Sequence, residues 1–314
     1  MLFRSVLHAF PLESGDEVVV TDHEYNACRN ALDRIAGRRG ARVAVAALPF
    51  PVAGDDEILE AIEAVLSPRT KLVMIDHITS PTGIILPVAA LAARLAERGV
   101  ALLVDGAHAP GMVPLALDRL GTTYYTGNCH KWLCTPKGAG FLYAPPAARE
   151  RLQPLVTSHG ANSPRTDRAR YQLEFDWTGT HDATAYYCIP EAIDFMAALL
   201  PGGWDAVRAH NHRLTVEGRT LLCETLGLQP PCPEEMIGSL GALILSRELP
   251  DPGGRFTPYQ DPLEKILYER YRITVPVIPW PDPRLRLLRI SGQMYNSREQ
   301  YEYLAAAVRE AGGW

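Results

Sequence analysis

The stretch PVAALAARLAERGVALLVDGAHAPG, residues 87–111, carries the pattern that decides the fold. Its Ala- and Leu-rich first half has the spacing of an amphipathic helix, and the apolar run 100–104 follows after a glycine. An apolar run without polar alternation is typical of a strand that is buried on both faces of a parallel sheet. We therefore expect a helix, then a buried parallel strand, and then a polar segment at the carboxyl end of that strand.

The same pattern repeats through the first half of the chain. Apolar runs alternate with helical patterns, and we expect strands within EVVVT (17–21), RVAVAAL (42–48), KLVMID (71–76), TTYYTG (122–127) and GFLYA (140–144). Alternation of this kind predicts an α/β fold, with a mainly parallel sheet sandwiched by helices.

The pattern changes after about residue 182. Two long helical stretches come first, at 183–200 and 204–226, and a last helix is expected at 297–311. Between them lie the strand-like runs GALILS (241–246), RITVPV (272–277) and LRLLRIS (285–291). We expect a large domain at residues 1–200 and a smaller C-terminal α+β domain at 201–314, with the boundary near LLPGGW.

Composition limits the class of partner. The chain has 314 residues, of which 47% are hydrophobic, and its net charge of −5 includes no basic run that would attract nucleic acid or an anionic membrane. No apolar run approaches the roughly 20 residues of a membrane span, and no signal-peptide pattern is present, so we expect a cytoplasmic protein. Six irregularly spaced cysteines favour reduced thiols over a disulfide framework. A small-molecule ligand is the expected partner.

Polar residues follow four of the expected strands. Ligands of such sheets bind beyond the carboxyl ends of the strands, so these positions are the candidates for a site. They are His23, Tyr25, Ser80, Thr82, Asp105, His108, His130 and Lys131.

Lys131 has the sequence context of a reactive amine. It follows a strand of the buried type and precedes Trp132 and Leu133, where desolvation would lower the pKa of an amine and leave it nucleophilic. A metal site from Cys129, His130, Cys134 and Asp105 is the alternative, but paired metal-ligand spacings are missing. The sequence also has no GxSxG, Walker A or GxGxxG motif, so nothing in it supports acyl hydrolysis, nucleotide hydrolysis or dinucleotide binding.

A strand-end aspartate together with a later His-Lys pair suits pyridoxal phosphate (PLP). The lysine amine can form a Schiff base with the aldehyde, and a carboxylate can keep the pyridine nitrogen protonated. Four segments, in this order, resemble the fold-type I, class V aminotransferase superfamily and within it the isopenicillin N epimerase-like group. They are VDGAHAPG (104–111), GNCHKWLCTPKGAGFLY (127–143), WTGTHDATAYYCIPEAI (177–193) and LRISGQMYNSREQYEYL (288–304).

The resemblance implies a role for each matching residue. Lys131 corresponds to the Schiff-base lysine, Asp105 to the partner of the pyridine nitrogen, and His108 to a residue that contacts the phenolic oxygen of the cofactor. His130 corresponds to a phosphate-binding neighbour of the lysine. Thr180 corresponds to a residue that reaches the phosphate of the partner subunit, which implies a homodimer with shared active sites.

The remaining roles concern the substrate and the cofactor ring. Arg289 corresponds to the arginine that holds the substrate α-carboxylate, a task that suits the bidentate guanidinium. Thr82 is expected among the cofactor-binding residues. The HEY segment matches the ring-stacking and acid-base position of the family, where Tyr25 is favoured over His23, although both stay open.

Two departures from the family pattern bear on the reaction. Residues 271–288 contain no cysteine, which argues against the persulfide route of the cysteine desulfurases. The family also has several dozen residues before the position of Met1, including an Asn-Ala-Thr-like turn that binds the cofactor phosphate at a helix N-terminus. The sequence is therefore expected to begin within that helix.

The expected activity is chemistry at the α-carbon of an amino acid. Lys131 removes the α-proton, and reprotonation from the opposite face, by Tyr25 or a water that it orients, gives epimerisation. Loss of a β-substituent would instead give a C–S lyase, and protonation of the cofactor carbon would give transamination. Epimerisation is the first prediction, and a pseudoenzyme or dimerising fragment is the alternative of another class.

Overall fold

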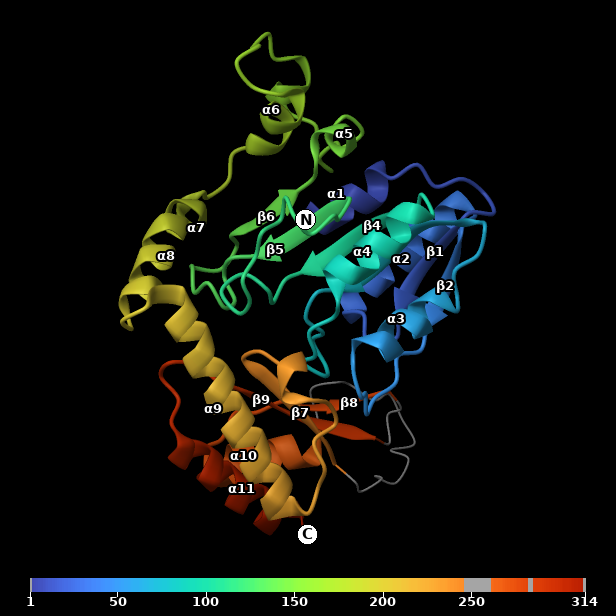
Figure 1. Cartoon of the computed structure of the whole chain (residues 1–314). Coiled ribbons are helices and arrows are strands. Elements are labelled where there is room, and N and C mark those ends of the chain that lie inside the picture. The colour runs from blue at the N-terminus through green and yellow to red at the C-terminus, as the bar shows by residue number, and fades with distance from the viewer. Residues whose placement is uncertain (1, 246–260, 282–284, 313–314) are drawn as a thin grey trace. The chain divides into compact units, whose positions relative to one another are not determined.

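The computed structural model describes residues 2–245, 261–281 and 285–312, and these form two compact units (Figure 1). The first unit comprises residues 1–47, 59–78 and 87–196. The second comprises residues 48–58, 79–86 and 197–314. Within the described chain, no helix combines the length and the apolar character that a membrane crossing requires.

The first unit is built on a six-stranded sheet in the order β2-β1-β3-β4-β5-β6. Neighbouring strands are parallel except for β5 and β6, which are antiparallel. The predicted α/β class with a mainly parallel sheet is thereby confirmed. The strands are β1 (Glu17–Thr21), β2 (Arg42–Ala46), β3 (Thr70–Asp76), β4 (Ala101–Gly106), β5 (Tyr124–Asn128) and β6 (Gly140–Tyr143).

Helices alternate with these strands, as the apolar spacing predicts. The longer ones are α1 (Leu2–Ala9), α2 (Asn26–Arg39), α3 (Asp55–Glu63), α4 (Val88–Glu97) and α8 (Ile189–Ala198). The shorter ones are α5 (Pro146–Arg149), η1 (His159–Asn162), α6 (Arg170–Asp176) and α7 (Thr184–Tyr187).

The central strands β1, β3 and β4 are buried on both faces, which explains their unbroken apolar runs. Alternate residues such as Val18 and Val20 of β1 pack with α1 and α2 in one core, while Val19 between them points to the other face and is also fully buried. Burial of both neighbours leaves no position where a polar side chain would gain from alternation, so the sequence shows none.

The helix predicted at 183–200 is interrupted. It forms α7 and α8 with Cys188 between them. The proline at 190 lacks the N–H that a continuous helix would direct to Tyr186, which favours a break near this point.

The second unit packs helices against a small antiparallel sheet in the order β7-β9-β8. Its core is formed mainly by leucine and valine side chains from both the helices and the strands. Its elements are α9 (Gly203–Leu226), η2 (Glu234–Met236), β7 (Leu240–Leu245), α10 (Pro262–Tyr271), β8 (Val277–Pro279), β9 (Arg286–Ser291) and α11 (Arg298–Gly312).

Two strand predictions in this unit need comment. The strand expected at 272–277 is displaced to Val277–Pro279, because Arg272 has a positive φ of 57° and Pro276 has no N–H to donate to a ladder. The strand predicted at 241–246 is β7, except that Ser246 lies outside the described residues.

Segments from the first half of the chain complete this unit. The N–H of Val52 donates to the carbonyl of Pro231, and Ile84 pairs with Ile237 in an antiparallel bridge. Thr82, placed by sequence among the cofactor-binding residues, therefore belongs to the same compact unit as Arg289.

Candidate active site

The carboxyl ends of β1, β3, β4 and β5 meet at one edge of the first sheet, because these strands are parallel. Asp76 at the end of β3 pairs in register with Asp105 of β4, and Asp105 pairs in turn with Thr126 of β5. The segment that follows β5 carries Lys131. The structure thus places the two residues with the strongest sequence assignment, Asp105 and Lys131, after neighbouring strands.

Lys131 lies in a chain of three polar groups. Its Nζ is 3.0 Å from Nε2 of His108, and the indole N–H of Trp132 donates to Nδ1 of the same ring over 3.2 Å. Since Nδ1 accepts this bond, a neutral imidazole carries its proton on Nε2. The imidazole of His108 thus lies between the indole of Trp132 and the amine of Lys131 and holds the amine in place.

A glycine allows the close packing that holds this arrangement. Gly111 has a φ of +87°, and a Cβ there would lie 2.4 Å from the carbonyl oxygen of Trp132. A side chain at this position would both strain the backbone and displace Trp132, the residue that fixes His108.

Asp105 is buried and is held by two hydrogen bonds. Its Oδ1 accepts from the backbone N–H of Ala107 at 2.9 Å, and its Oδ2 accepts from the thiol of Cys28 at 3.1 Å. Donors on both oxygens fix the orientation of the carboxyl group. A carboxylate held in this way can accept a bond from a protonated pyridine nitrogen, as its predicted role requires.

A buried hydrogen-bonded pair, His77 and Tyr125, packs against the end of β4, the strand that carries Asp105. Nδ1 of His77 is 2.7 Å from the hydroxyl of Tyr125, and the backbone N–H of His77 donates to the carbonyl of Asp105. Burial lowers the pKa of His77 to about 4, so this imidazole is neutral at physiological pH. A Cβ on Gly106 would lie 2.2 Å from the ring of Tyr125, so the pair packs directly against the end of β4.

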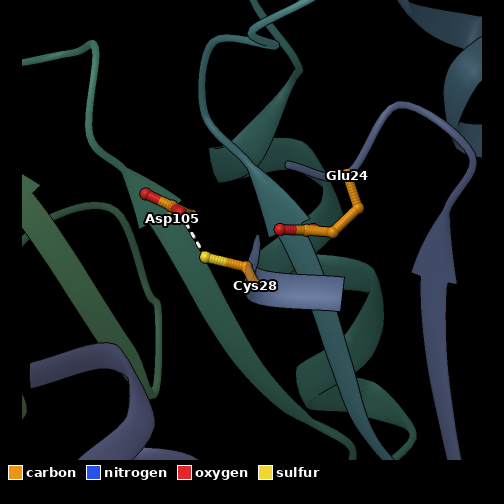
Figure 2. Close-up of side chains that lie close together, drawn as sticks. All are labelled: Glu24, Cys28 and Asp105. Atoms are coloured by element: carbon orange, nitrogen blue, oxygen red, sulfur yellow. Dashed lines mark hydrogen bonds between the residues drawn. The ribbon is translucent and has the colours of Figure 1, made fainter. Parts of the chain in front are cut away.

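Two further carboxyls lie beside Asp105 that sequence reasoning did not select. Figure 2 shows the Glu24 side chain directed toward Cys28 and Asp105, and the nearest oxygen and sulfur atoms of these three residues lie within 4.8 Å of one another. Burial, followed by the charge of Asp105, raises the pKa of Glu24 well above its usual range. Burial, followed by the charge of Glu24, does the same for the pKa of Asp76.

The sequence alternatives His23 and Tyr25 occupy different environments. His23 is fully buried, with Nδ1 3.0 Å from a carboxylate oxygen of Asp22. The side chain of Tyr25 is 45% exposed, and Nζ of Lys131 lies 6.0 Å from the centre of its ring. The structure therefore brings Tyr25 next to the lysine.

His130 and Thr180 lie in the first unit, and the structure leaves parts of both open to a ligand. Nδ1 of His130 donates to the carbonyl of Ala139 at 2.8 Å, and this bond anchors the ring. Thr180 is exposed in the segment that precedes α7.

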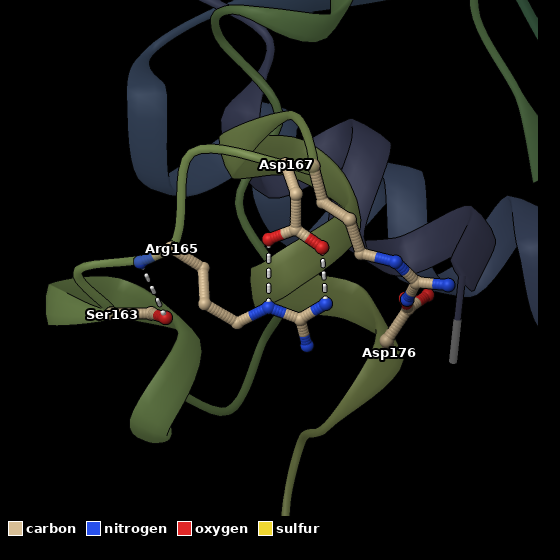
Figure 3. A network of polar contacts seen from close by, with 5 residues as sticks. Ser163, Arg165, Asp167 and Asp176 are labelled. Atoms are coloured by element: carbon tan, nitrogen blue, oxygen red, sulfur yellow. Dashed lines mark hydrogen bonds and ion pairs between the residues drawn. The ribbon is translucent and has the colours of Figure 1, made fainter.

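Surface ion pairs order the segment before Thr180 (Figure 3). Arg165 binds both carboxylate oxygens of Asp167, and Arg168 pairs with Asp176 at the end of α6. The Arg165 contact lowers the pKa of Asp167 to about 2. These exposed pairs organise the segment locally and contribute little to overall stability.

Arg289 is anchored within the second unit. Its Nη1 donates to the carbonyl of Ser80 and, at 3.3 Å, to the hydroxyl of that serine. Its buried Nε makes no hydrogen bond with any described residue. A fixed guanidinium with a spare buried donor is suited to hold a carboxylate. Thr82, also in this unit, is fully buried, and its hydroxyl lies 2.6 Å from that of Thr79.

The geometry does not support the metal site considered from the sequence. Across the described ranges, the one group of three donor side chains close enough for an ion is Glu24, Cys28 and Asp105. Cys129 and Cys134, which the alternative required, are not part of it.

Glu24, Cys28 and Asp76 carried weak sequence signals. Glu24 and Asp76 stand in the strand-end segments TDHEYN and DHITSPTG, where position alone could have selected them. Cys28 lies in α2, away from any strand end, and no spacing pattern marks it.

The donor set fits PLP. The amine of Lys131 and the buried carboxyl of Asp105 lie after adjacent strands, with His108 in contact with the amine. These are the groups that an aldehyde and a pyridine nitrogen need.

Comparison with known proteins establishes the family. The Aminotransferase class-V family profile matches residues 1–229. The chain is 35% identical over 318 residues to an isopenicillin N epimerase of Streptomyces clavuligerus, covering 96% of this chain and 76% of that one. It is 30% identical to a probable chloroplastic L-cysteine desulfhydrase of Arabidopsis thaliana, covering 94% of this chain and 64% of the relative.

The fold agrees with this result. A solved structure of a C-DES mutant, with glycine covalently linked to its PLP cofactor, matches with a TM-score of 0.79 at 22% identity and covers 99% of this chain and 78% of the other. The chain belongs to the class V aminotransferase family of PLP-dependent enzymes.

Proposed function

We propose that this protein is a PLP-dependent epimerase that acts at the α-carbon of an amino acid or an amino-acid-bearing substrate. The observation that carries the proposal is the contact between Lys131 and His108 at the sheet edge that also carries the buried Asp105. The similarity to isopenicillin N epimerase over 96% of the chain favours epimerisation over the other reactions of the family.

The bound cofactor would supply an aldehyde for covalent attachment and a protonated ring that withdraws electrons from the α-carbon. Lys131 would hold the aldehyde and, once displaced by the substrate amine, would take the α-proton at its Nζ. Asp105 would accept the bond from the ring nitrogen. Proton transfer by a positioned side chain of this kind contributes about 10²- to 10⁴-fold to a rate.

The other residues would bind and orient. His108 keeps Nζ of Lys131 in place and would contact the phenolic oxygen of the bound cofactor. His130 and Thr82 are proposed as cofactor-binding residues, and Arg289 as the residue that holds the substrate carboxylate through its spare Nε donor. Tyr25, beside Lys131, is the proposed ring-stacking residue.

We also propose a homodimer in which Thr180 reaches the cofactor phosphate of the partner subunit. Exposed apolar side chains in the segment around Thr180 support this proposal. The aromatic residues Trp177, Tyr187 and Phe195 are 47%, 82% and 61% exposed. They lie within 20 residues of one another in the chain. Large aromatic side chains exposed in one segment of the chain are a feature that an interface between proteins would explain. A cytoplasmic location remains a prediction.

A C–S lyase is the second candidate, favoured by the 30% identity to the cysteine desulfhydrase.

One screen separates the candidates. The purified protein, supplied with PLP, is incubated in deuterated water with isopenicillin N, with L-cysteine, and with a panel of D- and L-amino acids. Exchange of the α-proton with inversion of configuration supports the epimerase, whereas release of sulfide and a keto acid from cysteine supports the lyase. Keto acid from other amino acids would indicate transamination.

A further inference from the structure

Arg289 of β9 is anchored by a loop from a distant part of the chain. Its Nη1 donates to the carbonyl and to the hydroxyl of Ser80, a residue that follows β3. Both acceptors belong to a neutral side chain or to the backbone, and no carboxylate among the described residues pairs with this guanidinium. A cation with a buried donor and no counterion is suited to an anionic ligand.

The anchor leaves one edge of the guanidinium for such a ligand. Because Nη1 is bound to Ser80, the edge formed by Nε and Nη2 remains, and Nε is buried without a hydrogen-bond partner among the described residues. The N–H groups of Nε and Nη2 point the same way, so this edge can bind both oxygens of one carboxylate. The position of Ser80 therefore determines where the carboxylate-binding edge of Arg289 points.

Thr79 closes the loop that carries Ser80. We call residues 79–84 the Thr79 loop. The side chain of Thr79 is fully buried, and its Oγ1 accepts from the backbone N–H of Ile84 at 3.0 Å and lies 2.6 Å from Oγ1 of Thr82. The backbone N–H of Thr79 also donates to the carbonyl of Ile84 at 3.0 Å. A single hydroxyl group thus joins the start of the loop to its end.

The Thr79 loop packs against the sheet that carries Arg289. Gly83 has a φ of +71°, and a Cβ there would lie 3.0 Å from Cβ of Leu240 at the start of β7. β7 is paired with β9, and Ala242 of β7 lies opposite Arg289 in that register. The loop and the arginine are therefore held by neighbouring strands of one sheet, within one compact unit.

We propose that the Thr79 loop positions Arg289 for the substrate, because Thr79 holds Ser80 against Nη1 and so presents the Nε–Nη2 edge to the α-carboxylate. The inference rests on the proposed function, in which Arg289 binds that carboxylate. Thr79 acts through Ser80 and Arg289, so it is a positioning residue. Loss of its hydroxyl should weaken substrate binding and leave proton transfer by Lys131 unaffected.

The test compares Thr79→Val, which keeps the shape but lacks the hydroxyl, with the conservative variant Thr79→Ser. Thr70→Val is the matched control, because the hydroxyl of Thr70 is also buried but donates to Glu17 in the first unit. Each protein is supplied with PLP and assayed for α-proton exchange of isopenicillin N in deuterated water. Thr79→Val should raise KM by about 2- to 10-fold, the net worth of one hydrogen bond, with kcat near the parent value. Thr79→Ser should recover most of this difference, and Thr70→Val should keep the KM of the parent.

A second readout needs neither substrate nor cofactor. In the ¹⁵N-labelled, cofactor-free protein, the NMR signal of the Arg289 Nε–H group is identified by its loss in Arg289→Lys. This signal should shift or broaden in Thr79→Val, and also in Ser80→Ala, which removes one of the two acceptors of Nη1. It should stay in place in Thr70→Val. If Thr79→Val fails to fold, Ser80→Ala still tests whether the loop orients the guanidinium.

The possible failures are distinguishable. An unchanged KM in Thr79→Val, together with a raised KM in Arg289→Lys, would remove the loop from substrate binding and leave the role of Arg289 intact. An unchanged KM in both variants would reject the proposed role of Arg289 and the inference with it. If the parent shows no exchange, the proposed function fails, and the NMR signal alone decides about the loop. An unmoved Nε–H signal in both Thr79→Val and Ser80→Ala would show that the Thr79 loop does not position Arg289.

Discussion

The two compact units differ in the ionisable side chains that they hold. The strand ends of the first unit gather three carboxyls, Glu24, Asp76 and Asp105, and one amine, Lys131. The second unit holds Arg289, a guanidinium anchored by Ser80 with its Nε lacking a hydrogen-bond partner in the described chain. Under the proposed function, proton chemistry falls to residues of the first unit and anion binding to Arg289 of the second, so mutations in each should fail in different ways.

The largest effect is expected at Lys131. Lys131→Ala removes both the covalent anchor and a base, so α-proton exchange should fall by about 10⁴-fold or more, measured by NMR in deuterated water. Lys137→Ala is the control, because that lysine is exposed in the same loop and should leave the rate near the parent value. Loss of exchange in the control alone would reverse the assignment.

Asp105→Ala should come next. It removes the acceptor for the ring nitrogen, and a rate loss of about 10²-fold or more is expected because the ring then withdraws electrons less effectively. Covalent attachment of PLP to Lys131 should persist, since it does not need the ring proton. Equal exchange rates in the parent and the variant would refute the role of Asp105.

Arg289→Lys tests the second unit. Lysine keeps the charge but loses the planar fork, and the loss of a hydrogen bond to a charged group is worth about 1.5–3 kcal/mol. KM for the substrate should therefore rise by roughly 10- to 100-fold with the PLP absorbance unchanged. If kcat fell with an unaltered KM, the division between proton chemistry and anion binding would not hold.

The smallest effect concerns the support of the lysine. Gly111→Ala places a side chain at a φ of +87° and against Trp132, which should cost about 1–3 kcal/mol of unfolding free energy in denaturant titration. Gly37→Ala in α2, where a Cβ would meet nothing within 4 Å, should be neutral or stabilising by up to about 1 kcal/mol. Equal stability of the two variants would show that the contact with Trp132 is unimportant.

Sequence reasoning reached the sheet and its ligand-binding edge because both depend on local patterns. Strands buried on both faces leave unbroken apolar runs, and parallel strands bring residues such as Asp105 and the segment with Lys131 to one edge. The strand expected at 272–277 lies instead at Val277–Pro279. The positive φ of Arg272 depends on tertiary packing, which the apolar pattern of the sequence does not reveal.

The carboxyl cluster was missed for a related reason. Whether Glu24 is a solvated surface residue or a buried acid depends on how the turn after β1 folds against β3 and β4, which a strand-end position alone does not determine. Cys28 is harder still, because its contact with Asp105 joins residues 77 positions apart.

The central claim is that Lys131 carries the cofactor, and trapping tests it most directly. Protein supplied with PLP is reduced with borohydride, digested, and mapped by mass spectrometry. The account predicts a visible absorption band that reduction bleaches, with a stable pyridoxyl adduct on Lys131. An adduct on Lys137, or no adduct at all, as a pseudoenzyme would give, would contradict it.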